Sequence, residues 1–302
     1  MKRLINLVIL SFFAYFLFSY INKNKEIISF FYKINISYIL LFLCLTILNY
    51  IFRTLFNIYI YKSIDIKISV RESFDLALKN TMGNLIGPFK AGAGHNLHYM
   101  YKNYNLSPTL YVSVNTAFAI LLIFINFLLL LFTTLSLDNF LGLSKFYISL
   151  IIFFSILITY VILKFTLRNN ERINFKIFKN FATGFLSLFK DKLLFLKITT
   201  TATIYSIYNV LILYLTFEMF DFGIKFKNTL LYTLLGSLTS LVKLTPGNIG
   251  FYEFVMISLS EFHGIGPNEV LMSSIFLRFT NYISIIFLFI FSFLKNLKKR
   301  FK

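Results

Sequence analysis

The sequence contains few of the residues from which most catalytic and metal sites are built. Its 302 residues include one cysteine and three histidines, and only 12 Asp and Glu residues stand against 30 Lys and Arg residues. The single cysteine, Cys44, excludes an internal disulfide framework and a thiolate metal cluster. The chain also lacks a Gly-x-Ser-x-Gly nucleophile elbow, a Gly-Lys-Ser/Thr phosphate loop and an aspartate-rich metal motif. These absences argue against a hydrolase, a nucleotide-dependent enzyme and a metalloenzyme.

Hydrophobic residues, by contrast, are abundant. They make up 58% of the chain, whereas globular domains contain about 45–50%, so the sequence predicts an integral membrane protein. The formal net charge is +18, which in a soluble protein would suggest a nucleic-acid partner. Here Lys and Arg gather at the ends of apolar segments and in their connections, where they set the orientation of membrane helices. We therefore expect membrane lipids, and no nucleic acid, as partners.

Six apolar segments are long enough to cross a bilayer, which needs about 20 helical residues. The first of them follows the basic start Met1-Lys2-Arg3 and resembles a signal peptide. It has no convincing small-residue cleavage site, so we expect a retained helix. The predicted spans are residues 4–21, 36–60, 108–135, 146–163, 198–217 and 270–294.

The distribution of basic residues predicts the topology of these spans. Both chain ends and the connection 164–197 are basic and the connection 61–80 is polar, and we place all of them in the cytosol of a bacterial or archaeal cell. The three other connections carry fewer basic residues in total and are expected on the opposite side of the membrane: residues 22–33, 138–145 and 218–228. The whole chain, 1–302, then forms a single polytopic membrane domain.

The basic connection 164–197 contains apolar residues at helical spacing, namely Phe178, Phe181, Phe185 and Leu188. One interpretation is an amphipathic helix that lies on the anionic cytoplasmic leaflet. The other is an ordinary connector helix whose apolar face packs on the helix bundle. The sequence alone leaves both open.

A Pro/Gly-rich stretch at residues 243–253 (KLTPGNIGFYE) lies between two apolar segments that are each too short to span a bilayer. Pro246 removes a backbone donor, and Gly247 and Gly250 permit backbone angles that other residues resist. Interrupted backbone at membrane depth is tolerated only where protein or a polar cavity covers it. We therefore predict a re-entrant helical hairpin, with Lys243 and Glu253 beside its break and Asn248 within it.

A second candidate hairpin occurs at residues 80–95. It is rich in Gly and Asn and contains one Pro and one Lys, and its candidate substrate-binding residues are Asn84, Pro88, Lys90, Gly92, Gly94 and His95, with His98 just beyond. In each half of the chain a broken hairpin precedes a proline-started long span, over residues 36–135 and 198–294. If the hairpins enter from opposite faces, they form an inverted repeat, an architecture typical of transporters with a midplane site.

Arg278 lies well inside the last predicted span, where an unpaired cation is costly. One interpretation is that Glu253 pairs with it and merely pins the hairpin to this helix. The other, which we favour, is that Arg278 and Lys243 receive an anionic head group. Backbone N–H groups at the helix start after Gly247 would then help to bind phosphate. Arg53 lies near the cytosolic end of its span, and snorkelling explains it.

The pair His95 and His98 could share one face of a helix, which suggests a metal site. No Cys or acidic residue lies near enough in sequence to complete a ligand set, and His263 is distant. We expect these histidines to bind phosphate or to lie at the cytosolic interface, and we expect neither a metal nor a cofactor.

The residues around the second break resemble a known family, that of the lysylphosphatidylglycerol synthase transmembrane region and its stand-alone flippase-like relatives. The family tends to carry Pro-Gly-x-x-Gly-x-x-Glu, a short loop and then Arg-x-x-x-Tyr. All of these positions match here, at Pro246, Gly247, Gly250, Glu253, Arg278 and Tyr282. Residues 84–94 are similar to the family's first Pro/Gly segment, although this chain has histidines at positions 95 and 98 where the family often has Glu and Arg.

The resemblance implies lipid translocation: a flippase that moves an anionic phospholipid or a lipid-linked glycan precursor across the inner membrane. The alternative is an integral membrane transferase, or an accessory protein that contacts an envelope-synthesis enzyme. Bifunctional relatives add a soluble aminoacyl-transfer domain, which we do not expect in this chain of 302 residues. Acidic residues placed for general-base chemistry would favour the transferase, and Glu253 is the one candidate within the predicted membrane segments.

Overall fold

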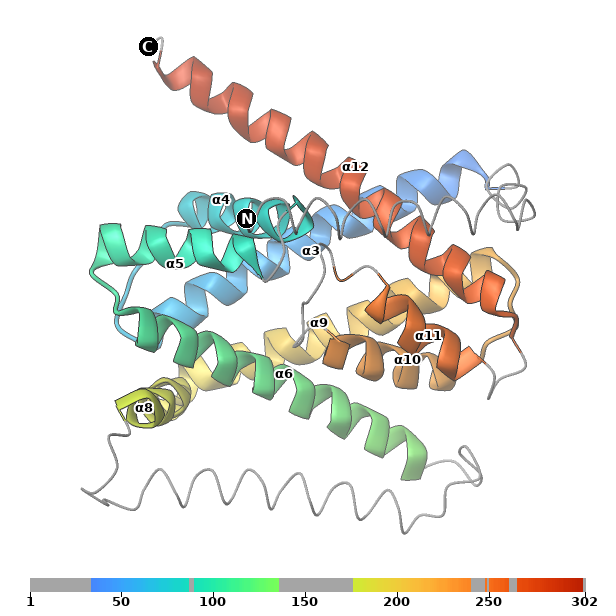
Figure 1. The fold of residues 1–302 in the computed structure, drawn as a ribbon, viewed down its shortest axis with the longest axis horizontal. Helices are drawn as coiled ribbons and strands as arrows, with labels where there is room; N and C mark the ends of the chain where they lie inside the picture. Colours follow the sequence, from blue (N-terminus) through green and yellow to red (C-terminus); the bar gives the residue numbers. More distant parts are fainter. Residues whose placement is uncertain are drawn as a thin grey trace, which may run out of the picture.

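The computed structural model describes residues 34–86, 90–135, 176–239, 248, 250–260 and 265–300. Within these ranges it contains nine α-helices and no β-strand, as the predicted all-α class requires (Figure 1). The helices are α3 (Ile36–Lys62), α4 (Val70–Ile86), α5 (Ala91–Tyr104), α6 (Pro108–Leu135), α8 (Lys176–Lys190), α9 (Lys192–Met219), α10 (Phe226–Thr239), α11 (Phe251–Ser260) and α12 (Pro267–Arg300).

Four of the described helices are long and apolar enough to cross a membrane, over Ile36–Lys62, Pro108–Leu130, Lys192–Met219 and Pro267–Ser292. They coincide with four of the predicted spans, so the prediction of an integral membrane protein is confirmed. Two of them begin earlier than predicted: α9 starts after the N-cap Asp191, and α12 starts at Pro267. The predicted spans at 4–21 and 146–163 lie outside the described residues.

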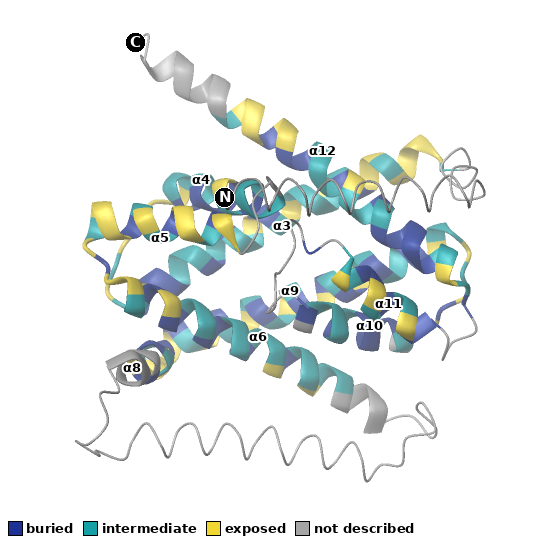
Figure 2. Cartoon of the chain, in the orientation of Figure 1, coloured by how far each residue is buried: buried dark blue, intermediate teal, exposed yellow. Residues whose placement is uncertain are grey.

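The outer faces of these helices carry large apolar side chains. Leu40 and Ile51 on α3, and Phe287 and Phe291 on α12, are all exposed on the isolated chain (Figure 2). In water such faces would be unfavourable, but hydrocarbon chains solvate them without penalty. Their distribution fits helices that face lipid.

Two pairs of short helices follow one another with an interruption between them. The first pair is α4–α5, and the second is α10–α11; they lie on opposite sides of the molecule in Figure 1. Residues 70–80, which were predicted as part of a polar connection, form the first turns of α4. The reason is that Leu76, Ala77 and Leu78 are buried there, so this segment packs as a helix.

The α4–α5 pair is joined by a close approach of its two backbones. A Cβ atom added at Gly92 would lie 1.8 Å from the carbonyl oxygen of Asn80, and one added at Gly83 would lie 2.6 Å from Cα of Gly92. Only glycine permits helices to come this near. Asn84 also links α4 to α5, because its side-chain oxygen accepts a hydrogen bond from the backbone N–H of Gly92 (3.0 Å).

Helix α8 packs against α6 and α9. Leu188 is fully buried and Phe185 is partly buried against the core, while Leu186 and Phe189 are exposed. This is the packed connector of the two interpretations above. Contact with the leaflet is a separate property, and it stays a prediction.

Candidate functional site

A cavity of about 290 Å³, here called the arginine pocket, is lined by residues from both interrupted helix pairs. Residues of α3, α4, α10, α11 and α12 line it. Asn84 and Leu85 come from the end of α4, Thr239 from the end of α10, and Asn248 from the segment just before α11. The other polar and charged lining residues are Arg53, Thr81, Tyr252, Ser274, Arg278, Asn281 and Tyr282. Described residues that flank both interruptions therefore line one cavity.

Arg278 of α12 and Glu253 of α11 form a buried ion pair beside this pocket. The Nη2 atom of Arg278 lies 2.7 Å from Oε1 of Glu253, and Nε donates to the same oxygen at 2.8 Å. The hydroxyl of Ser274 also donates to Oε1, at 2.5 Å. Glu253 is 8% exposed, so its charge is compensated by these donors rather than by water.

The second carboxylate oxygen of Glu253 holds the start of α11. Oε2 accepts a hydrogen bond from the backbone N–H of Gly250 at 2.7 Å. Gly250 has φ = +90°, which side-chain-bearing residues rarely adopt. Glu253, three residues further on, thus reaches back to the residue that opens the helix, in the manner of a capping box.

Asn248 connects this turn to the end of α10 and to Arg278. Its Nδ2 group donates to the carbonyl oxygen and to the hydroxyl of Thr239, at 3.2 Å and 2.9 Å. Its own carbonyl oxygen accepts from Nη2 of Arg278 at 3.3 Å. Asn248 has φ = +59°, a conformation that Asn tolerates better than most residues. Arg278 therefore contacts both the backbone just before α11 and the carboxylate of Glu253.

Arg53 is the site residue that sequence reasoning missed. It lines the arginine pocket from α3, and it donates to Oδ1 of Asn49 at 2.7 Å and to the hydroxyl of Thr81 at 3.3 Å. Both partners are neutral, and within the described ranges no carboxylate forms an ion pair with Arg53. A signal was present: Arg53 lies nine residues before Lys62, the end of α3, which is about 13 Å at 1.5 Å per residue. That depth argues against simple snorkelling.

The predicted site residues divide into three groups. Asn84, Asn248, Arg278 and Tyr282 line the pocket, and Glu253 and Gly250 support it from behind. A second group lies on α5 or at its start and is not part of the described pocket lining: Lys90, Gly92, Gly94, His95 and His98. The third group, Pro88, Lys243, Pro246 and Gly247, lies outside the described residues.

The histidines on α5 are exposed. Partial desolvation lowers the pKa of His95, and the positive charges of Lys79 and His98 lower it further. A lowered pKa favours the neutral imidazole at neutral pH, which is a weak partner for phosphate. In the part of the chain that the structure describes, no three His, Cys, Asp or Glu side chains come together as a metal-binding group.

The sequence profile described as the lysylphosphatidylglycerol synthase transmembrane (TM) region matches residues 3–288. The chain belongs to this family. Searches of curated proteins and of solved structures find no match. Membership in the lysylphosphatidylglycerol synthase TM-region family, together with the four apolar helices, indicates a membrane protein involved in lipid or cell-envelope processes.

Proposed function

We propose that this protein moves an anionic, phosphate-bearing lipid, either a phospholipid or a lipid-linked glycan precursor, between the leaflets of a bacterial or archaeal cytoplasmic membrane. The observation that carries the proposal is the charge of the arginine pocket. Arg53 and Arg278 come from the two halves of the chain and line one cavity. Of these two arginines, only Arg278 forms an ion pair with a described carboxylate. The pocket therefore has excess positive charge at a depth where an anion would compensate it.

The proposed transport function requires a specific membrane topology. Helices α5, α10 and α11 have 14, 14 and 10 residues, fewer than the about 20 that a span requires. We propose that each pair is a re-entrant hairpin, that the two enter from opposite faces, and that six full spans complete the bundle. Alternate opening of the pocket past one hairpin and then the other would expose the head group to each leaflet in turn.

The surroundings of Glu253 favour transport over group transfer. A general base needs an oxygen that is available to accept a proton from the substrate. Here both oxygens of Glu253 already accept hydrogen bonds, from Arg278, Ser274 and the N–H of Gly250. Because both oxygens are already held by donors of the protein, Glu253 serves this site better as a structural anion than as a general base.

The test is leaflet exchange in liposomes that contain the purified protein and carry a labelled phospholipid or polyprenyl phosphate in one leaflet. We expect faster exchange than in empty liposomes. The Gly250→Val variant should lose this acceleration, because a β-branched residue is strained by about 1–3 kcal/mol at a positive φ and displaces the turn that Glu253 holds.

The matched control is Gly223→Val. Gly223 also has a positive φ, +65°, but it has open space around it and lies in the connection between α9 and α10. It should therefore show similar strain and retain exchange. If no anionic lipid exchanges, yet a covalently altered lipid appears after a donor substrate is added, the protein is a transferase.

A further inference from the structure

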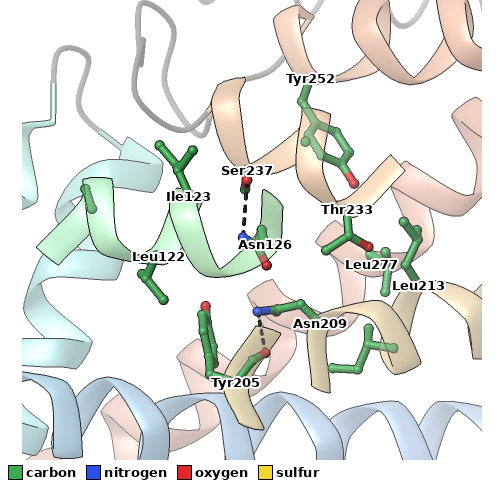
Figure 3. A pocket seen from close by; sticks show the side chains of 13 residues that line it. Leu122, Ile123, Asn126, Tyr205, Asn209, Leu213, Thr233, Ser237, Tyr252 and Leu277 are labelled. Carbon is green, nitrogen blue, oxygen red and sulfur yellow. Dashed lines mark hydrogen bonds between the residues drawn. The ribbon is translucent and has the colours of Figure 1, made fainter. Parts of the chain in front are cut away.

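A second cavity, here called the apolar pocket, adjoins the arginine pocket. It has a volume of about 310 Å³ and lies between α6, α9 and α10 (Figure 3). Its apolar lining includes Leu122 and Ile123 of α6 and Ile212 and Leu213 of α9, and none of its described lining residues is charged. Helices α6 and α9 are two of the four candidate membrane spans, so this pocket lies among helices that pass through hydrocarbon.

The polar side chains of the apolar pocket bond mainly to the protein itself. Asn126 of α6 donates to the hydroxyl of Ser237 on α10 at 3.4 Å (Figure 3). Ser237 in turn donates to the carbonyl oxygen of Leu234. Asn209 and Thr233 each donate to a backbone carbonyl one turn earlier in their own helices. Such bonds hold membrane helices together or satisfy the side chain locally. They use one donor of each amide and the hydroxyl hydrogens of Ser237 and Thr233.

Tyr252 lies on the boundary between the two pockets. Three residues line both of them, namely Gly236, Tyr252 and Leu277. A Cβ atom added at Gly236 would lie 2.8 Å from Cε2 of Tyr252, so the absence of a side chain at position 236 lets the ring lie against α10. On its other side, the guanidinium of Arg278 lies 5.8 Å from the centroid of the same ring. The boundary thus has a charged side and an apolar side.

From this juxtaposition we infer that the apolar pocket binds one hydrocarbon chain of the lipid whose phosphate occupies the arginine pocket. The inference rests on the proposed function and adds a second contact with the substrate. A phosphate would not enter the apolar pocket, because no described lining residue there could compensate its charge. A chain would fill it favourably, and the polar glycerol region between head group and chain would lie beside Tyr252. The protein would then recognise an amphiphile and not a free phosphate.

The test is photo-crosslinking with phosphatidic acid that carries a diazirine in one acyl chain, using the purified full-length protein in nanodiscs. Lipid-facing residues of α6 and α9 will be labelled without saturation. We expect additional labelling of the pocket residues Ile123 and Ile212 that saturates and that excess unlabelled phosphatidic acid removes. The Ile123→Trp and Ala119→Phe variants, which fill the pocket, should reduce the saturable labelling at Ile212 to the level of the competed sample.

The control is Phe124→Trp, a neighbouring position whose side chain is exposed on the isolated chain; it should leave the labelling of Ile212 unchanged. Suppose that the pocket shows no saturable labelling although the protein still binds phosphatidic acid and Arg53→Gln weakens that binding. This inference would then be wrong, while the proposed function would stand. If diacylglycerol competes as well as phosphatidic acid, the chain site stands and the anionic selectivity of the proposed function is wrong. Competition by inorganic phosphate alone would contradict the requirement for a chain.

Discussion

Arg278 and Glu253 meet through two nitrogen atoms and one oxygen atom, because Nη2 and Nε of the arginine lie 2.7 Å and 2.8 Å from the same Oε1 atom. The other oxygen of the carboxylate is thereby left to the N–H of Gly250. The ion pair thus attaches α11 to α12 and holds the backbone turn that leads into α11. Nη2 also reaches the carbonyl of Asn248, so the arginine contacts both sides of that turn.

We predict that Arg278→Ala abolishes lipid exchange and lowers stability by about 3 kcal/mol, because it leaves a buried carboxylate without its cation. Arg278→Lys should restore exchange only in part, since an ammonium group cannot replace the two nitrogens of the guanidinium. The measurements are leaflet exchange in liposomes and thermal unfolding of the purified protein.

A double substitution separates the structural task from head-group binding. Arg278→Met with Glu253→Gln removes both charges, so stability should return toward that of the wild type. Exchange should remain absent if Arg278 binds the head group. Full exchange by the double variant would show that Arg278 only pins the hairpin.

We predict that Arg53→Gln weakens binding of phosphatidic acid by about tenfold or more, the value of one hydrogen bond to a charged group. Lys62→Gln on the same helix removes the same charge at an exposed position outside the described pocket lining and should change binding little. Titration at two salt concentrations is a useful second measurement, because a screened surface effect would disappear at high salt. Equal losses in the two variants would contradict a specific role for Arg53.

We predict that Gly92→Ala destabilises the protein by about 1–3 kcal/mol, the usual range for overpacking. The new methyl group would overlap the carbonyl of Asn80. The control is Gly94→Ala, two residues further along α5, where no atom lies within 4 Å of the added Cβ. There the substitution should stabilise the helix by up to about 1 kcal/mol. Thermal unfolding in detergent measures both, and a neutral Gly92→Ala variant would disprove the close contact of α4 and α5.

We predict that both chain ends and residues 164–197 face the cytosol. In protein with Cys44 replaced by Ser, a cysteine at position 140 should react with an impermeant maleimide on intact cells. A cysteine at position 180 should react only after permeabilisation. The reverse pattern would show that the predicted orientation is inverted, and reaction of both on intact cells would exclude the proposed topology with its opposed hairpins.

The membrane class, four of the spans and both interruptions were predictable from the sequence. The reason is that lipid imposes a length of about 20 apolar residues on a span, and Pro and Gly mark the places where a helix stops. The pairing of Arg278 with Glu253 was predictable for a similar reason, because an isolated cation in a span requires a partner.

The depth of Arg53 in its span could have been noticed, but its partners were not predictable, since the pocket is assembled from α3, α4 and α12 and no local pattern encodes that packing. For the same reason, the sequence does not distinguish Gly92 from Gly94 within the glycine-rich segment 80–95. In fact Gly92 packs closely on α4, and Gly94 has open space. The early start of α4 was hidden by its polar residues. Its buried face, with Leu76 and Leu78, becomes apparent only when the neighbouring helices are placed.

The contacts within the two helix pairs give them different stiffness. In α4–α5 the contact is backbone against backbone, through Gly83 and Gly92, and no change of rotamer can release it. In α10–α11 the corresponding close approach is between Gly236 and the ring of Tyr252, which can rotate about its side-chain torsions. Although the two pairs occupy equivalent positions in the sequence, α4–α5 would stay rigid during transport and α10–α11 would move. A transport cycle built on them would be mechanically asymmetric, with opening to one leaflet requiring a side-chain rotation and opening to the other requiring displacement of a rigid pair.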